Sequence, residues 1–159
     1  MNRSRYVTRH IDVTDRAIIA ALNENGRLKL CELAEQVGLS SPSVTERIHK
    51  LHDAGAIRNY TIAIDPTVFG LGITAHVRMR ARPGEVTRLA QMLVDTPEIV
   101  EAERVTGEDC FVAKVIVADV AELAKVIDPF LPFSSTDTAI VQSVTVPRRL
   151  PKLNGSRHI

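Results

Sequence analysis

The stretch from Lys29 to Leu51 constrains the fold more strongly than any other part of the chain. In its first half, apolar residues recur at helical spacing, and Gly38 follows where a helix would end in a left-handed conformation. Ser40 or Ser41 can accept hydrogen bonds from the free N–H groups of a second helix, and Pro42 suits its first position. The pattern predicts two short helices joined by a glycine turn, a helix-turn-helix. The apolar positions are Leu30, Leu33, Ala34 and Val37, then Val44, Ile48 and Leu51.

The outward face of the second helix is polar and could meet DNA. The cations Arg47 and Lys50 suit phosphate or guanine, and the hydroxyl and imidazole groups suit base edges or backbone. Glu46 would repel phosphate, so it either accepts from a cytosine amino group or, as we expect, pairs along the helix with Arg47 or Lys50. A helical hairpin of this kind also occurs in all-α domains that bind no nucleic acid. The predicted DNA-binding residues are Ser41, Ser43, Thr45, Glu46, Arg47, His49 and Lys50.

The flanking segments place this helical pair in a larger unit. A further helix runs from Asp12 to Asn25, where Asp12 or Thr14 can cap it. Residues 12–56 are therefore predicted to form a three-helix, winged-type helix-turn-helix domain that binds DNA. The next residues, Ile57 to Ile64, alternate in a way that predicts a strand, so residues 57–72 are expected to be a strand hinge.

Residues 73–147 follow another pattern, in the order strand, helix, strand, strand, helix, strand. This order predicts a ferredoxin-like βαββαβ plait, an antiparallel sheet with both helices on one face, and hence an α+β protein. The other sheet face is left uncovered, so we expect self-association across it. The expected strands are Ile73–Arg82, Ile99–Val105, Phe111–Val117 and Ala139–Val146, and the helices run from Val86 to about Thr96 and from Val120 to Leu131.

The chain of 159 residues has a net charge of only +1, distributed unevenly. Residues 1–60 carry +2, residues 61–147 carry −5 and residues 148–159 carry +4. The acidic middle cannot be the main phosphate-binding surface, so nucleic acid would meet the N-terminal part, and a single copy would bind it weakly. Residues 1–11 form a basic arm and residues 148–159 a tail, which we expect to be disordered ends; contact of the arm with DNA is the alternative.

Other side chains argue against a metal site, a cofactor or catalysis. Cys31 and Cys110 are far apart in the sequence and match no disulfide framework and no metal-ligand spacing. No Ser/His/Asp set converges, because the histidines are scattered. No segment resembles a signal peptide or a membrane span, so we expect a cytoplasmic protein. The histidines are His10, His49, His52, His76 and His158.

Five different short motifs occur along the chain, and their combination is specific. They are Asp12-x-x-Asp15-x-x-Ile18, Asn25-Gly26-Arg27, Leu33-Ala34-x-x-Val37-Gly38-Leu39-Ser40, Val44-x-x-Arg47-Ile48 and Leu51-x-x-x-Gly55-x-Ile57. Together they resemble the Lrp/AsnC family, the "feast/famine" transcriptional regulators of bacteria and archaea, over nearly the whole chain. The resemblance implies a regulator of double-stranded DNA whose homodimers commonly assemble into octamers, with small effectors, usually amino acids, bound between dimers. A dimer implies a pseudo-palindromic DNA site.

The same resemblance locates the effector loop at residues 105–111 and a second effector segment at residues 134–138. Many members carry a Gly-Asp-aromatic-Asp-aromatic run in the loop, whereas this chain has Asp109 and Cys110 at its third and fourth places. A bound amino acid needs acceptors for its ammonium and donors for its carboxylate. The alternative is that Thr106-Gly107 is only a turn and the threonines are sheet residues. The predicted effector-binding residues are Thr106, Gly107, Glu108, Asp109, Asp119, Thr136 and Thr138.

Two other functions are compatible with this architecture. A minority of such proteins, similar to sirohaem decarboxylases, act on a tetrapyrrole and would need a His, Arg and Tyr cluster. The run His76, Arg78, Arg80 and Arg82 is the only candidate, and we expect it to be a solvated or inter-subunit face and the protein not to be an enzyme. The third possibility is a nucleoid-type architectural protein that binds DNA without an effector.

Overall fold

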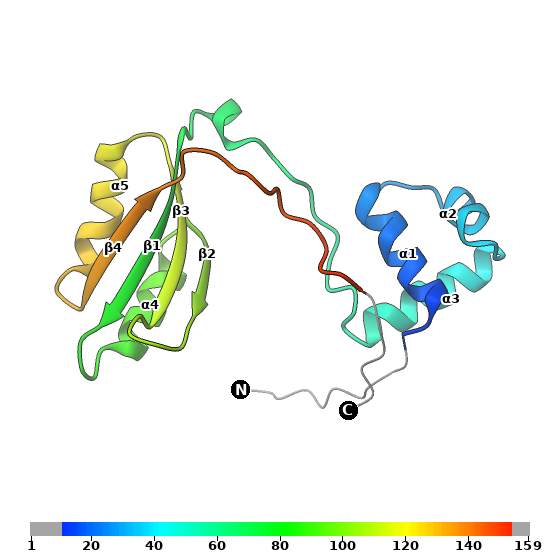
Figure 1. The fold of residues 1–159 in the computed structure, drawn as a ribbon, viewed down its shortest axis with the longest axis horizontal. Helices are drawn as coiled ribbons and strands as arrows, with labels where there is room; N and C mark the ends of the chain where they lie inside the picture. The colour runs from blue at the N-terminus through cyan, green and yellow to red at the C-terminus, as the bar shows by residue number, and fades with distance from the viewer. Residues whose placement is uncertain (1–10, 154–159) are drawn as a thin grey trace. The chain divides into compact units, whose positions relative to one another are not determined.

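The computed structural model describes residues 11–153. Residues 1–10 of the predicted basic arm and residues 154–159 of the predicted tail lie outside the described residues. The chain divides into two compact units (Figure 1). Among the described residues, the first unit comprises residues 11–63 and 148–153, and the second spans Ile64–Pro147. Each unit has its own hydrophobic core.

The first unit contains three helices, α1 (Val13–Glu24), α2 (Leu30–Val37) and α3 (Ser41–Asp53). α1 begins with a reciprocal capping pair, in which the Asp12 and Asp15 carboxylates each accept from the other's backbone N–H. α2 ends at Gly38, which has a left-handed φ of 67°, and the Ser40 side chain caps α3. These local signals produce the predicted helix-turn-helix. Its core consists of Ile18, Leu33, Ala34, Val44 and Leu51.

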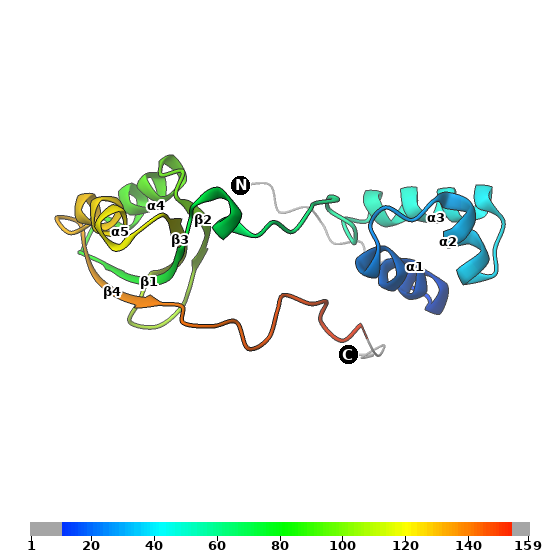
Figure 2. The same ribbon diagram turned by 90° about the horizontal axis from the view of Figure 1, so that it is seen from above.

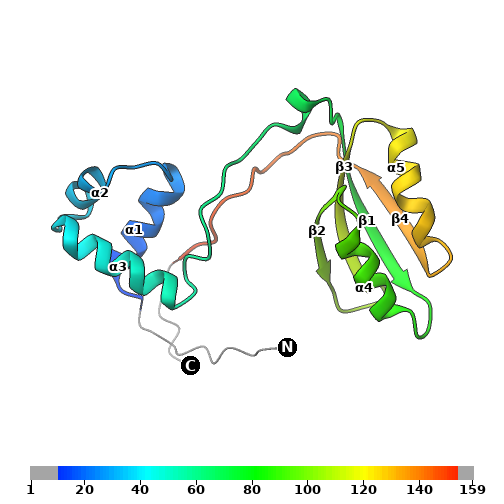
Figure 3. The same cartoon turned by 180° about the vertical axis from the view of Figure 1, so that it is seen from behind.

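The second unit is the predicted plait. Its sheet has the strand order β2-β3-β1-β4, and every neighbouring pair is antiparallel. Both long helices cover the same sheet face (Figure 2, Figure 3), and alternate β3 residues point into the core beneath them. No helix of the second unit covers the other face of the sheet, where the alternate β1 residues are exposed. The elements are η1 (Pro66–Phe69), β1 (Ile73–Ala81), α4 (Val86–Asp95), β2 (Ile99–Arg104), β3 (Phe111–Val117), α5 (Val120–Ile127), η2 (Asp128–Phe130) and β4 (Ser134–Ile140).

Two strand predictions are corrected by the structure. The strand predicted from Ile57 to Ile64 is absent, although the side chains there alternate as those of a strand would. Tyr60, Ile62 and Ile64 are exposed. A strand requires a hydrogen-bonding neighbour, and no strand pairs with this segment within the described chain. The last strand runs over Ser134–Ile140 rather than Ala139–Val146, because β4 pairs with β1 from Ser134 opposite Ala81 onward. The first half of this edge strand is polar, so the hydrophobic pattern does not indicate a strand there.

Among residues 11–153, no helix combines the length and the apolar character that crossing a membrane requires.

Candidate nucleic-acid interface and effector loop

The predicted DNA-binding residues all lie on α3, but they are not equally exposed. Glu46, His49 and Lys50 are exposed, whereas the other four are half-buried. Two of the hydroxyl groups are already engaged within the helix: Thr45 Oγ1 donates to the Ser41 carbonyl at 3.0 Å, and the Ser43 hydroxyl shares a hydrogen bond with that of Ser40 at 2.8 Å. Glu46 forms an ion pair with Lys50 one turn further along α3. This is one of the two pairings that the sequence predicts for Glu46.

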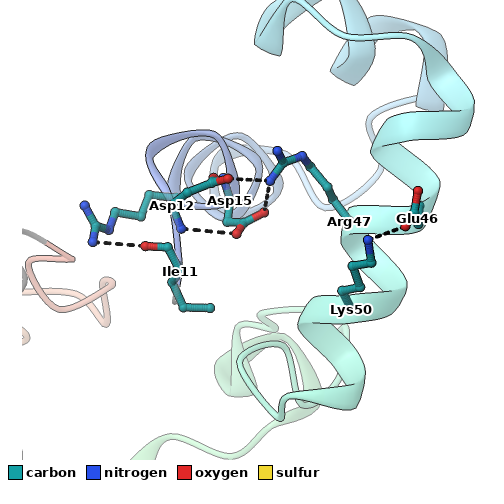
Figure 4. A network of polar contacts seen from close by, with 7 residues as sticks. Ile11, Asp12, Asp15, Glu46, Arg47 and Lys50 are labelled. Carbon is teal, nitrogen blue, oxygen red and sulfur yellow. Dashed lines mark hydrogen bonds and ion pairs between the residues drawn. The ribbon is translucent and has the colours of Figure 1, made fainter. Parts of the chain in front are cut away.

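Arg47 points away from the exposed face, toward the N-terminal turn of α1 (Figure 4). Its Nη1 donates to Asp12 Oδ2 at 2.7 Å and to Asp15 Oδ1 at 2.8 Å. The two carboxylates are the same ones that form the capping pair of α1, so one guanidinium group joins α3 to both. In the same turn, Arg16 Nη2 donates to the Ile11 carbonyl at 3.2 Å. We refer to Arg47, Asp12 and Asp15 as the α1–α3 clamp.

The contacts of the clamp shift the pKa values of two of its members. Donation by the Asp15 backbone N–H, and then by the Arg47 side chain, holds the pKa of Asp12 below its ordinary value. The hydrogen bonds to Asp12 and Asp15 raise the pKa of Arg47 above its already high value. At neutral pH the clamp therefore combines the Arg47 cation with the ionised Asp12 carboxylate, and the Asp15 carboxylate accepts from the same guanidinium group.

A cavity of about 460 Å³ lies beside the clamp, between α1 and α3. Its lining mixes both signs of charge with serine and apolar side chains, which suits neither a metal ion nor a purely apolar ligand. The described part of the chain contains no group of three or more His, Cys, Asp or Glu side chains placed to hold a metal ion. Besides the clamp, the cavity is lined by Ile11, Leu39, Ser43, Glu46, Lys50 and Leu51.

The predicted effector loop connects β2 with β3 and is fixed at its base. The Val105 N–H donates to the Cys110 carbonyl at 3.0 Å, and the Cys110 N–H donates to the Met79 carbonyl of β1 at 2.8 Å. Within the loop, Gly107 has a φ of 117°, which favours glycine. The loop is thus a tight turn held against the end of β1.

A β1 side chain that was not among the predicted effector residues joins this loop. Arg80 Nη2 donates to Glu108 Oε2 at 2.6 Å and lies 4.0 Å from Asp109 Oδ1. Two residues earlier, Arg78 forms an ion pair with Asp137 of β4. Both arginines are exposed on the open sheet face. The alternation of polar and apolar residues in β1 correctly predicts that both arginines lie on the exposed face. Their ion pairs depend on strand register, which cannot be determined from the sequence alone.

The structure does not bring all predicted effector residues together. Thr136 and Thr138 stand opposite Met79 and Val77, whose side chains belong to the core, so they lie on the helix-covered face and not beside Arg80. Asp119 follows the far end of β3 and caps α5 by accepting from the Glu122 N–H at 2.8 Å. Only the residues of the loop from Thr106 to Asp109 form a contiguous group.

Comparison with known proteins places both units in one family. Residues 11–52 match the AsnC-type helix-turn-helix domain, and residues 74–151 match the Lrp/AsnC ligand-binding domain. An uncharacterised helix-turn-helix regulator of Bacillus subtilis, YezC, is 35% identical over 133 residues, which are 84% of this chain and 94% of YezC. The chain belongs to the Lrp/AsnC family of transcriptional regulators. The family resemblance inferred from the sequence motifs is thereby confirmed.

Solved members of the Lrp/AsnC family share the fold of this chain. The structure of Bacillus subtilis LrpC matches with a TM-score of 0.83 and 27% identity over 88% of this chain and all of LrpC. The regulator NMB0573 of Neisseria meningitidis, solved as a complex with L-Met, matches with a TM-score of 0.76 and 27% identity over 94% of this chain and 96% of that one. The α+β fold prediction is confirmed. The family consists of transcriptional regulators, so the chain is a regulator with a ligand-binding domain and not an enzyme.

Proposed function

We propose that this regulator binds a pseudo-palindromic DNA site through α3 of two copies, and that an amino acid bound by the second unit modulates DNA binding or assembly. The observation that carries the proposal is the presence of an AsnC-type helix-turn-helix and a Lrp/AsnC ligand-binding domain in one chain. Two recognition helices related by a twofold axis match half-sites about 34 Å apart or a multiple of that distance.

On the DNA side, Lys50 is the phosphate-binding residue that the structure supports best. Its side chain is 46% exposed, and its partner Glu46 is more exposed still. An exposed pair of this kind contributes little, so a DNA phosphate can replace the Glu46 carboxylate as the partner of Lys50. Base contacts are expected from the earlier part of α3, at Ser41, Ser43 and Thr45, with His49 reaching backbone or base edges.

Selection from a random duplex pool tests the DNA proposal. The duplexes should be about 40 bp long, which accommodates two half-sites one or two helical turns apart. We expect recovery of an inverted repeat, and we expect Lys50→Met to lower the salt dependence of its binding by about one unit. Lys125→Met on α5 is the matched control and should leave the salt dependence unchanged. Recovery of no common sequence would instead favour the architectural alternative.

On the effector side, an α-amino acid fits the groups that the structure gathers at the loop. Arg80 can pair with its carboxylate, and Glu108 and Asp109 can accept from its ammonium group. Thr106 and Gly107 add a hydroxyl group and backbone groups of the same turn. A family member solved with L-Met shows that an amino acid is a ligand of that relative. We place Asp119, Thr136 and Thr138 outside this contact set, because they lie at the far strand end or on the other sheet face.

A thermal-shift screen of the twenty amino acids tests the effector proposal. We expect at least one to raise the melting temperature of the wild-type chain and to lose this effect in Arg80→Met. Arg78→Met is the matched control, because Arg78 lies on the same strand face and also pairs with a carboxylate, but away from the loop. A response that survives Arg80→Met places the effector elsewhere. No response to any amino acid favours a regulator without this effector.

Self-association is the third part of the proposal. The open face of the sheet and the exposed alternating side chains of residues 58–64 are surfaces that a second copy can cover. We propose a homodimer as the basic form and an octamer as its larger assembly. Light scattering coupled to size-exclusion chromatography, with and without the amino acid found in the screen, gives the mass directly. A monomer at micromolar concentration contradicts this part of the proposal.

A further inference from the structure

We propose that Arg47 is a positioning residue for DNA recognition, which sets the placement of α3 on α1 through Asp12 and Asp15 and does not contact DNA itself. The inference rests on the proposed DNA binding by α3. It gives Arg47 a different role from the phosphate or guanine contact that its place in the sequence predicts. The carboxylates of Asp12 and Asp15 thereby become part of the recognition apparatus.

The geometry of the clamp supports a fixed position for Arg47. One nitrogen of the guanidinium group donates to two carboxylates at 2.7 and 2.8 Å, and these carboxylates are themselves held by the capping pair of α1. The Arg47 side chain is 32% exposed and that of Asp15 only 14%. Charge-assisted hydrogen bonds between groups that are already oriented lose little conformational entropy when they form. The clamp thus joins two rigid helix segments.

The charge balance of the clamp argues against direct contact between Arg47 and phosphate. To reach DNA, the guanidinium would have to leave two carboxylates, one of which is largely buried. A phosphate that bound Arg47 in its present position would lie close to both carboxylates. Two carboxylates within hydrogen-bond distance of the arginine disfavour the approach of a phosphate. Lys50 differs, because it has one exposed partner on its own helix and can exchange it for phosphate.

The surroundings of the clamp explain why α3 needs it. A cleft of about 460 Å³ opens beside the clamp, so at this edge of the α1–α3 contact the clamp joins the two helices in place of close packing, whereas Ile18, Val44 and Leu51 pack together in the core. Ser43, Glu46 and Lys50 line the same cavity and lie within one turn of Arg47 along α3. Any rotation or shift of α3 after loss of the clamp would therefore move the side chains that are proposed to meet DNA.

Asp15→Asn separates the two roles of Arg47 by the sign of its effect. If Arg47 contacts DNA, removing an acid that holds it should release the arginine and tighten binding. If Arg47 is a positioning residue, the same change should weaken binding to the selected duplex by about tenfold. It should leave binding to a random-sequence duplex within about twofold, because the phosphate contacts remain. Unfolding would weaken both equally, so the ratio of the two affinities distinguishes positioning from loss of fold.

Arg47→Met and the double variant complete a thermodynamic cycle. We expect Arg47→Met, which removes both contacts of the clamp, to lower the affinity ratio at least as much as Asp15→Asn without changing the salt slope. In the Arg47→Met background, Asp15→Asn should have little further effect. Glu46→Gln is the matched control on α3, because it also removes an acid beside a cation, here Lys50, and it should tighten binding.

Three results would overturn the inference: tighter or unchanged binding by Asp15→Asn, a salt slope that falls by about one unit in Arg47→Met, or additive effects in the double variant. Should Arg47→Met prove unfolded by hydrogen exchange, the sign of the Asp15→Asn effect still decides, because that variant keeps the contact between Arg47 and Asp12. Failure of the proposed function is recognised separately, by a wild-type chain that selects no sequence or by Lys50→Met leaving the salt slope unchanged.

Discussion

Replacement of Gly38 by alanine should destabilise the three-helix unit by about 1 kcal/mol. Gly38 ends α2 with φ 67° and ψ 34°, and the next N–H, that of Leu39, returns to the Ala34 carbonyl at 3.0 Å. A side chain in this left-handed conformation costs about 1–2 kcal/mol. Restricting the unfolded chain offsets about 0.4–1 kcal/mol of that cost. No heavy atom lies within 4 Å of where the new Cβ would stand, so the backbone conformation alone causes the loss.

Gly26→Ala is the matched control, because Gly26 also lies between two helices of the same unit. Its φ is not positive, and a Cβ there would meet the Leu22 carbonyl oxygen at 3.6 Å, an ordinary contact. The same substitution should therefore stabilise the unit by about 0.4–1 kcal/mol through its effect on the unfolded chain.

Amide hydrogen exchange followed by mass spectrometry measures both variants, because it reads the peptides of α1–α3 separately from those of the second unit. We expect protection of the α2 and α3 peptides to fall about fivefold in Gly38→Ala and to rise in Gly26→Ala. Equal effects of the two substitutions would refute the assignment of the loss to the left-handed turn. If the protection against exchange changed only in peptides of the second unit, Gly38 would not lie in the three-helix unit as the structure shows.

The remaining predictions concern the acid response and the two cores. The pKa of Asp12 is lowered in the folded chain. The ionised Asp12 carboxylate therefore stabilises the folded state above about pH 4, and this stabilisation is lost as the pH falls through the lowered pKa of Asp12. Urea unfolding between about pH 5 and pH 2 should therefore be less pH-dependent in Asp12→Asn than in the wild type. Ile18→Ala, at a fully buried position, should destabilise α1–α3 by about 2–5 kcal/mol, measured by hydrogen exchange. Phe130→Ala should cost about 3–5 kcal/mol in the second unit and leave the exchange of α1–α3 unchanged.

The helices and the plait could be predicted because their signals are local. Gly38 and Ser40 mark the turn through their own conformational and hydrogen-bonding properties, which depend little on the rest of the chain. The alternation of β1 and β3 records which face each side chain occupies. Where a single residue type determines a single backbone feature, the sequence is sufficient.

The environment of individual site residues could not be predicted in the same way. The partners of Arg47 lie 32 and 35 positions earlier in the chain, and only the packing of α1 on α3 brings them within reach. Arg80 meets the predicted effector loop because of strand register, and Thr136 faces the core side for the same reason. The polarity of a residue such as Arg47 or Arg80 indicates that its side chain is either exposed to solvent or paired with another side chain. It does not indicate which of these two environments the fold provides.

The ion pairs of α3 limit how tightly one copy can hold DNA. Lys50 is paired with Glu46, and Arg47 with Asp12 and Asp15, so carboxylates accompany both of these cations on α3. Because affinity for DNA grows with the number of phosphates neutralised, a helix with one exchangeable cation supplies only a weak electrostatic term. Two linked copies of the same helix raise the effective concentration of the second contact without any new residue. If the proposed dimer forms, we therefore expect its weakening to reduce DNA affinity more than any single substitution in α3, and we expect self-association to be the step at which an effector has most control.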